Sequence, residues 1–152
     1  MKNHQLPVAM NKLNWGKTTL FPITETGLSS GWVDVSAQKD SIYSEDYKRT
    51  NARLRGAVKC SKAGESVEIK WNGTILGFSD IHYGSGCKIQ IRIDADPITF
   101  ERTQKKKSKY ARFFYLPEQT PGEHTVLLTI TELPNGTEYY LGQILVIGAV
   151  IP

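Results

Sequence analysis

The sequence predicts an all-β protein, an antiparallel β-sandwich of the jelly-roll kind. Helical periodicity is nearly absent from its 152 residues, and short strand-like runs recur between turn residues. The clearest run, Cys87–Asp94, alternates isoleucine with polar residues, so Ile89, Ile91 and Ile93 should face the core together. Strands at such even spacing are typical of a sandwich or barrel.

The remaining elements follow from the same pattern. The strand-like runs in chain order are Thr18–Phe21, Trp32–Val35, Ala52–Cys60, Ser66–Trp71, Thr74–Phe78, Cys87–Asp94, Thr125–Thr131 and Glu138–Ile147. One short helix is predicted over Ser44–Asn51, with Ser44 as its cap. The aromatic residues of one further strand should divide between its two faces: Tyr110, Phe113, Phe114 and Tyr115.

Two Asn-Gly pairs predict hairpin turns. Asn72-Gly73 follows Trp71, and Asn135-Gly136 precedes the last strand. Both begin an Asn-Gly-Thr triplet, which is also the N-glycosylation acceptor pattern. The turn interpretation explains both triplets without a modifying enzyme.

Length and composition favour one soluble domain over residues 1–152, as a whole protein or as a domain cut from a longer chain. Hydrophobic residues make up 39% and charged residues 22%. No apolar run is long enough to span a membrane, and the N-terminus lacks the apolar core of a signal peptide. The two cysteines, Cys60 and Cys87, can pair or remain buried thiols, and the sequence slightly favours thiols.

The basic run Arg102–Arg112 holds six positive residues and no acid. It has two interpretations, an anionic-polymer patch or a solvated loop between strands. The loop is the better prediction, so no nucleic-acid partner is expected.

Catalytic patterns are weak. Gly27-Leu-Ser-Ser-Gly31 matches the nucleophile-elbow spacing, but a strand follows it where an elbow needs a helix, so a loop is predicted. Asp80 and His82 share a strand face and could form an acid/base pair, yet no local pattern supplies an activated nucleophile. Histidine and cysteine spacing fits no metal site, and no cofactor is expected.

Two segments carry a family resemblance. Val67–Asp94 reads VEIKWNGTILGFSDIHYGSGCKIQIRID, and Tyr110–Glu132 reads YARFFYLPEQTPGEHTVLLTITE. Together with Glu138–Gly148, they resemble the galactose-binding-like jelly-roll domains attached to SGNH/GDSL-type hydrolases. The resemblance covers about residues 54 to 148. Such hydrolases carry Gly-Asp-Ser and Asp-x-x-His blocks in a separate domain, and neither block occurs here.

The resemblance implies a non-catalytic accessory or carbohydrate-binding domain of a bacterial extracytoplasmic hydrolase. Its partners would be a carbohydrate or a covalently linked hydrolase domain. The predicted ligand site lies at a sandwich end, at Trp32 and in the Asp80–Gly86 loop, with Asp80, His82 and Tyr83. The alternatives are a packing module without a ligand and a standalone esterase using Ser29 or Ser30 with His82.

Overall fold

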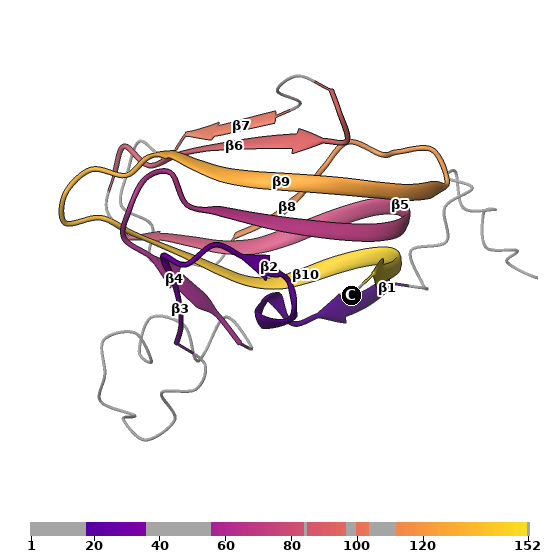
Figure 1. The fold of residues 1–152 in the computed structure, drawn as a ribbon, viewed down its shortest axis with the longest axis horizontal. Coiled ribbons are helices and arrows are strands. Elements are labelled where there is room, and N and C mark those ends of the chain that lie inside the picture. The colour runs from indigo at the N-terminus through magenta and orange to yellow at the C-terminus, as the bar shows by residue number, and fades with distance from the viewer. Residues whose placement is uncertain (1–17, 36–55, 84, 97–99, 104–111, 152) are drawn as a thin grey trace, which may run out of the picture.

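The computed structural model of the chain describes residues 18–35, 56–83, 85–96, 100–103 and 112–151. Within these residues the fold is β-structure with a single 3-10 turn (Figure 1). The elements are β1 (Thr18–Phe21), η2 (Ile23–Glu25), β2 (Gly27–Leu28), β3 (Trp32–Asp34), β4 (Val58–Cys60), β5 (Ser66–Tyr83), β6 (Lys88–Ile93), β7 (Phe100–Thr103), β8 (Arg112–Tyr115), β9 (Gly122–Glu132) and β10 (Glu138–Ile151).

Every strand pair is antiparallel, as the sequence predicts. The main path of hydrogen-bonded neighbours is β3-β4-β10-β5-β9-β6-β7. Strand β1 pairs with β10, and β2 and β8 both pair with β5. The two long strands β5 and β10 therefore take part in most of the strand pairings of the fold.

Strand β5 belongs to both layers of the sandwich. Its first part, residues 66–73, pairs with β9, and its later part, residues 77–80, pairs with β8. Figure 1 shows β5 curling over at the right-hand side between these two parts, beside the similarly curved β10. Strands that switch layers in this way make the corners of a sandwich.

A pair of glycines forms this corner. Gly73 lies opposite Gly148, next to a shift in the β5–β10 register. A Cβ on Gly73 would lie 2.1 Å from the Ile147 carbonyl oxygen, and one on Gly148 would lie 2.0 Å from the Asn72 carbonyl oxygen. Gly148 also has a φ of 130°, which favours glycine. The predicted Asn72-Gly73 hairpin is therefore wrong: the glycine serves close backbone approach inside one continuous strand.

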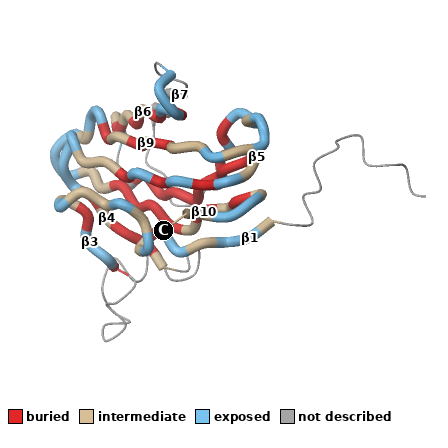
Figure 2. The backbone as a smooth tube through the Cα atoms, turned by 45° about the vertical axis from the view of Figure 1, so that its right-hand side comes forward, coloured by how far each residue is buried: buried red, intermediate tan, exposed pale blue. Residues whose placement is uncertain are grey.

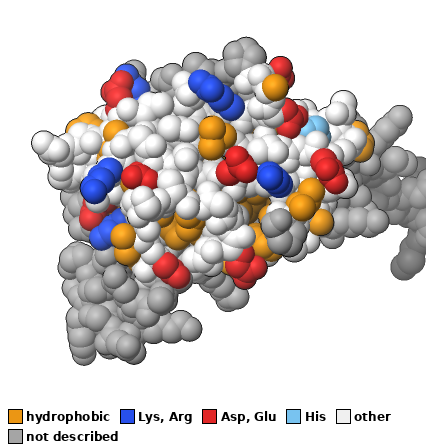
Figure 3. All heavy atoms as spheres, viewed as in Figure 1, with side chains coloured by type: hydrophobic (Ala, Val, Ile, Leu, Met, Phe, Trp, Pro, Cys, Tyr) orange, Lys and Arg blue, Asp and Glu red, His pale blue; other side chains and the backbone are white. Residues whose placement is uncertain are grey.

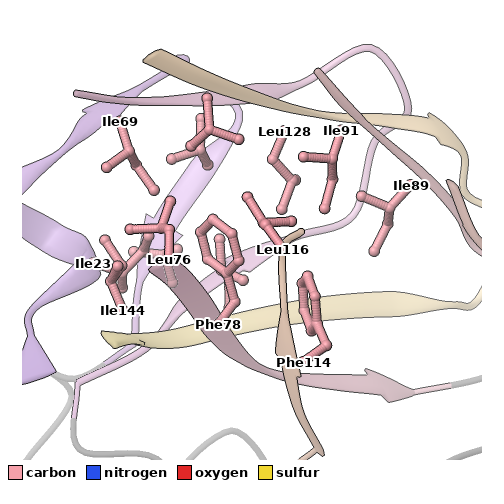
Figure 4. Close-up of a cluster of buried hydrophobic side chains, with 14 of the residues drawn as sticks. Ile23, Ile69, Leu76, Phe78, Ile89, Ile91, Phe114, Leu116, Leu128 and Ile144 are labelled. Carbon is pink, nitrogen blue, oxygen red and sulfur yellow. The ribbon is translucent and has the colours of Figure 1, made fainter. Parts of the chain in front are cut away.

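The core lies between the two layers. In Figure 4, Ile69, Ile89, Ile91 and Leu128 on one side face Leu76, Phe78, Phe114 and Ile144 on the other. All of these side chains belong to one buried cluster. Figure 2 shows the buried stretches concentrated along the middle of the long strands.

Several predictions of single elements are confirmed. Ile89, Ile91 and Ile93 are at most 2% exposed. The predicted turn at Asn135-Gly136 is found between β9 and β10, with a hydrogen bond from the Thr137 amide to the Pro134 carbonyl at 3.0 Å. These two strands pair with β5 and not with each other, so the predicted hairpin at this turn is wrong. Gly136 has a φ of 76° there.

Other predictions fall partly outside the described residues. The helix over Ser44–Asn51, most of the basic run Arg102–Arg112, and Tyr110 lie outside them. Of the strand predicted over Ala52–Cys60, residues 56–60 are described, and the last three of them, Val58–Cys60, form β4. Among the described residues, no helix has the length and apolar character needed to cross a membrane.

Candidate functional site

The predicted ligand residues lie on strands, not in a loop. Asp80, His82 and Tyr83 belong to the last part of β5, which corrects the predicted Asp80–Gly86 loop. Trp32 begins β3. The Tyr83 backbone pairs with Glu138, whereas the Tyr83 side chain is not among the described parts of the structure.

Strand register brings Trp32 and His82 into one row. Trp32 pairs with Cys60, Cys60 with Tyr139, and Tyr139 with His82. Paired residues point to the same face of a sheet, so the row faces the core. Tyr139, which the sequence reasoning did not single out, lies at its centre. Its only signal was a Tyr-Tyr pair at the start of the last strand.

Tyr139 links the predicted residues through its ring and its hydroxyl. Its ring meets the His82 ring edge-on at 4.8 Å and the Trp32 ring edge-on at 6.1 Å, measured between ring centroids. Its hydroxyl donates to Asp80 Oδ2 at 3.2 Å. The same carboxylate oxygen lies 3.0 Å from His82 Nε2, and since a carboxylate accepts, that nitrogen is the donor.

The cluster is closed to solvent. Asp80 is 0% exposed, His82 2% and Trp32 8%. His82 Nδ1 is buried without a hydrogen-bond partner within the described part of the chain. A ligand would have to open the sandwich to touch these groups. The structure thus assembles three of the predicted residues as an internal polar network, and their role in ligand binding stays a prediction.

The Gly27–Gly31 segment begins with strand β2 and ends in a turn, so the predicted loop is found only in its second part. Ser29 donates its hydroxyl hydrogen to Glu65, and it accepts a hydrogen bond from the Ser66 amide at 2.9 Å. Glu65 also accepts from the Gly31 amide at 2.9 Å. The hydrogen bonds from Ser29 and Gly31 lower the pKa of the Glu65 carboxyl. This serine is a loop anchor and makes no bond to His82.

The remaining candidates hold no reactive centre. Cys60 and Cys87 are both buried thiols and form no disulfide, as the sequence slightly favours. Burial raises the pKa of the Cys60 thiol, which keeps it protonated and unreactive. Within the described ranges, no group of three or more His, Cys, Asp or Glu residues could hold a metal ion.

A cleft of about 220 Å³ lies where β2 and the end of β10 meet β5. Its polar lining comes from Glu25, Glu68 and Lys70, and its apolar lining includes Val150 and Ile151. Lys70 Nζ lies 3.7 Å from Glu68 Oε1. None of the predicted ligand residues lines this cleft.

Exposed aromatic side chains occur on β8. Phe113 is 52% and Tyr115 44% exposed, whereas Phe114 between them is 7% exposed. The predicted division of these aromatics between two faces is thereby confirmed for the described residues. On the face seen in Figure 3, hydrophobic side chains form small groups between charged residues.

Comparison with known proteins identifies the fold. No protein-family model and no curated protein matches the sequence. Among solved structures, a family two carbohydrate esterase from Cellvibrio japonicus matches 89% of this chain at 14% identity and a TM-score of 0.66. A two-domain esterase active on acetylated mannans matches 93% of the chain at 14% identity and a TM-score of 0.66.

The chain spans only part of these esterases but nearly all of a binding module. It covers 35% of the first esterase and 39% of the second. The CBM36-1 domain of a xylanase from the hindgut metagenome of Trinervitermes trinervoides matches 88% of this chain at 10% identity and a TM-score of 0.58, and 99% of that domain is covered. At such identities the likeness establishes the fold, and the chain is an antiparallel jelly-roll β-sandwich like these domains.

Proposed function

We propose that the chain is a non-catalytic carbohydrate-binding domain that accompanies an esterase-type hydrolase. The observation that carries the proposal is the fold match. The chain is similar to almost the whole of a carbohydrate-binding domain, but to only about a third of each carbohydrate esterase. Fold alone does not fix function, so the chemistry of the chain must agree with the proposal.

The arrangement of the candidate nucleophiles supports a non-catalytic role. A serine hydrolase needs its serine within hydrogen-bond reach of a base, and the base must meet the substrate. Ser29 is hydrogen-bonded to Glu65 instead. His82 is directed at Asp80 in a closed interior. Neither of these side chains presents a reactive atom to a substrate.

The proposal has consequences for location and partners. Structural polysaccharides lie outside the cytoplasm, so the domain would work in the periplasm, the cell envelope or the surrounding medium. Its partners would be a glycan and a hydrolase domain in the same polypeptide. The basic run before β8 lies largely outside the described residues, so the expectation of no nucleic-acid partner stays a prediction.

Titration of the purified chain tests the binding function. Oligosaccharides from plant cell walls and bacterial envelopes would be added in turn, with binding followed by NMR or calorimetry. A single shallow site should bind one of them with a Kd around 1 mM, which corresponds to about −4 kcal/mol. Binding to none of the panel would remove the proposed function.

An esterase assay tests the non-catalytic role separately. We expect no turnover of p-nitrophenyl acetate above background by the wild type. Clear turnover that disappears in Ser29→Ala or Ser30→Ala would show that the chain is an esterase. Both substitutions belong in the same assay, because the two serines are neighbours in one turn.

A packing module without a ligand is the second candidate. It is favoured by two exposed aliphatic side chains, Leu20 at 53% and Val33 at 49%. This candidate predicts that no glycan binds and that the chain associates with a hydrolase domain instead.

A further inference from the structure

We infer that the glycan stacks on the outer face of β8, on the rings of Tyr115 and Phe113, and not on the residues around Trp32. This inference rests on the proposed function and gives it a site. It also commits to one ligand class, a polysaccharide chain that presents the apolar faces of successive sugar rings.

Strand β8 separates its side chains cleanly between the two faces. Phe114 and Leu116 enter the core and are 7% and 4% exposed. Phe113 and Tyr115 therefore point outward, because successive side chains of a strand alternate. Both rings are about half exposed. Among the described residues, the other large hydrophobic side chains that are this exposed are aliphatic.

The Tyr115 ring leans across the neighbouring strand. Register places Tyr115 opposite Gly77 of β5. A Cβ on Gly77 would lie 2.6 Å from Tyr115 Cδ1 and 3.0 Å from Cε1, so the ring occupies the space where a side chain would stand. An aromatic side chain often covers a glycine in this way. One side of the ring is thereby supported, and the exposed part offers an apolar surface to a sugar.

The strand beneath the rings is held firmly. Phe114 stacks on Phe78 with ring centroids 5.2 Å apart and an angle of 27° between the rings. Just after β8, the Leu116 amide donates to the Leu76 carbonyl at 2.9 Å. Figure 4 shows Phe114 and Leu116 directed into the core beside Phe78. Because the strand is already fixed, its backbone needs no further ordering when a ligand binds, which lowers the entropy cost of binding.

The size of this surface suits a sugar better than a protein. A wholly exposed aromatic side chain offers 150–250 Å², so two half-exposed rings offer about 200 Å² together. A stable protein interface needs about 800 Å² on each partner. On the same outer face, the register continues from Tyr115 through Gly77 and the partly buried Leu145 to Leu20, which is half exposed. Even with Leu20 included, the exposed apolar area stays well below that of a protein interface.

The spacing of the rings predicts a minimum ligand. Residues two apart on one strand lie about 7 Å from each other along the strand. One sugar ring can cover Tyr115 or Phe113 but not both. Oligosaccharides of two or more units should therefore bind more tightly than the monosaccharide, with the chain running along β8.

The test uses the glycan that the wild type binds in the titration above. Tyr115→Ala and Phe113→Ala should each weaken binding at least tenfold, since each removes one stacking surface. Tyr115→Phe keeps the ring and should stay within about threefold of the wild type. Gly77→Ala should weaken binding several-fold, because the added methyl group displaces the Tyr115 ring without removing it.

The matched control is Val33→Ala, which shortens an exposed apolar side chain on β3 and should leave the Kd unchanged. Circular dichroism and the thermal midpoint of each variant establish that it is folded. Amide shifts on titration give an independent readout, with the largest changes expected along β8. If the wild type binds a glycan but Tyr115→Ala and Phe113→Ala bind it equally well, the inference is wrong and the proposed function stands. If no glycan binds the wild type, both fail.

Discussion

Aromatic side chains on the core face of one layer and on the outer face of β8 differ in their exposure to solvent. On the core face, Trp32, Tyr139 and His82 are packed together across neighbouring strands and closed to solvent. On the outer face, Phe113 and Tyr115 are half exposed. Alternation along a strand tells which residues share a face, but it does not tell which face is open. A ligand site can be placed only when both facts are known.

The largest expected difference between the faces is in stability. Tyr139→Ala would empty a fully buried site and remove two ring contacts, so it should lower the free energy of unfolding by about 3–5 kcal/mol. Tyr115→Ala on the outer face should cost about 1 kcal/mol or less. Urea denaturation of both variants measures the contrast. Equal losses would mean that the outer ring is as much a part of the core as Tyr139.

Sequence patterns predicted the strands whose environment is uniform along their length. Cys87–Asp94 and Thr125–Thr131 each keep one face buried throughout, so simple alternation was enough to place β6 and β9. The same holds for the division of Phe113, Phe114 and Tyr115 between faces. These elements can be predicted without knowing which other strands pack against them.

The corner of the sandwich could not be predicted in that way. Asn-Gly is the strongest short-range hairpin signal, yet Asn72-Gly73 lies within β5 because Gly148 lies opposite it. That pairing joins residues far apart in the chain and becomes visible only in three dimensions. The buried role of Asp80 and His82 was hidden for the same reason. Their burial depends on Tyr139 and Trp32 from other strands.

The contrast between faces can be sharpened within a single strand. Ile91→Ala on the core side of β6 should cost about 2–5 kcal/mol, because Ile91 is wholly buried. Its neighbour Gln90 is only partly buried, and Gln90→Ala should change the free energy of unfolding by no more than about 0.5 kcal/mol. Thermal or urea unfolding of the pair decides the register. A small loss for Ile91→Ala would overturn the assignment of the faces.

A second histidine–aspartate pair offers a contrast to the closed His82–Asp80 pair. His124 Nδ1 lies 2.8 Å from Asp94 Oδ2, and His124 Nε2 lies 2.7 Å from the Thr120 carbonyl oxygen. Both partners are acceptors, so the protonated imidazolium, which carries hydrogen on both ring nitrogens, is the form that satisfies both contacts. The hydrogen bonds to Asp94 and then to Thr120 raise the pKa of His124 above its ordinary 6.5. The sequence missed this pair because its members are 30 residues apart.

The smallest expected effect is the pH dependence that this second pair gives to stability. A raised histidine pKa stabilises the fold below about pH 6.5, and this contribution is lost as the pH rises through the folded-state pKa. For Asp94, partial burial acts to raise the pKa, but the hydrogen bonds from His124 and Thr125 outweigh it and lower the pKa. The stabilisation from Asp94 is therefore lost only in acid, below the ordinary pKa of 3.8.

Between about pH 6 and 9, the thermal midpoint of the wild type should fall more steeply than that of His124→Gln. Asp94→Asn should lower the pKa of His124 measured by NMR. If the midpoints of the wild type and His124→Gln change in parallel with pH, protonation of His124 does not stabilise the fold.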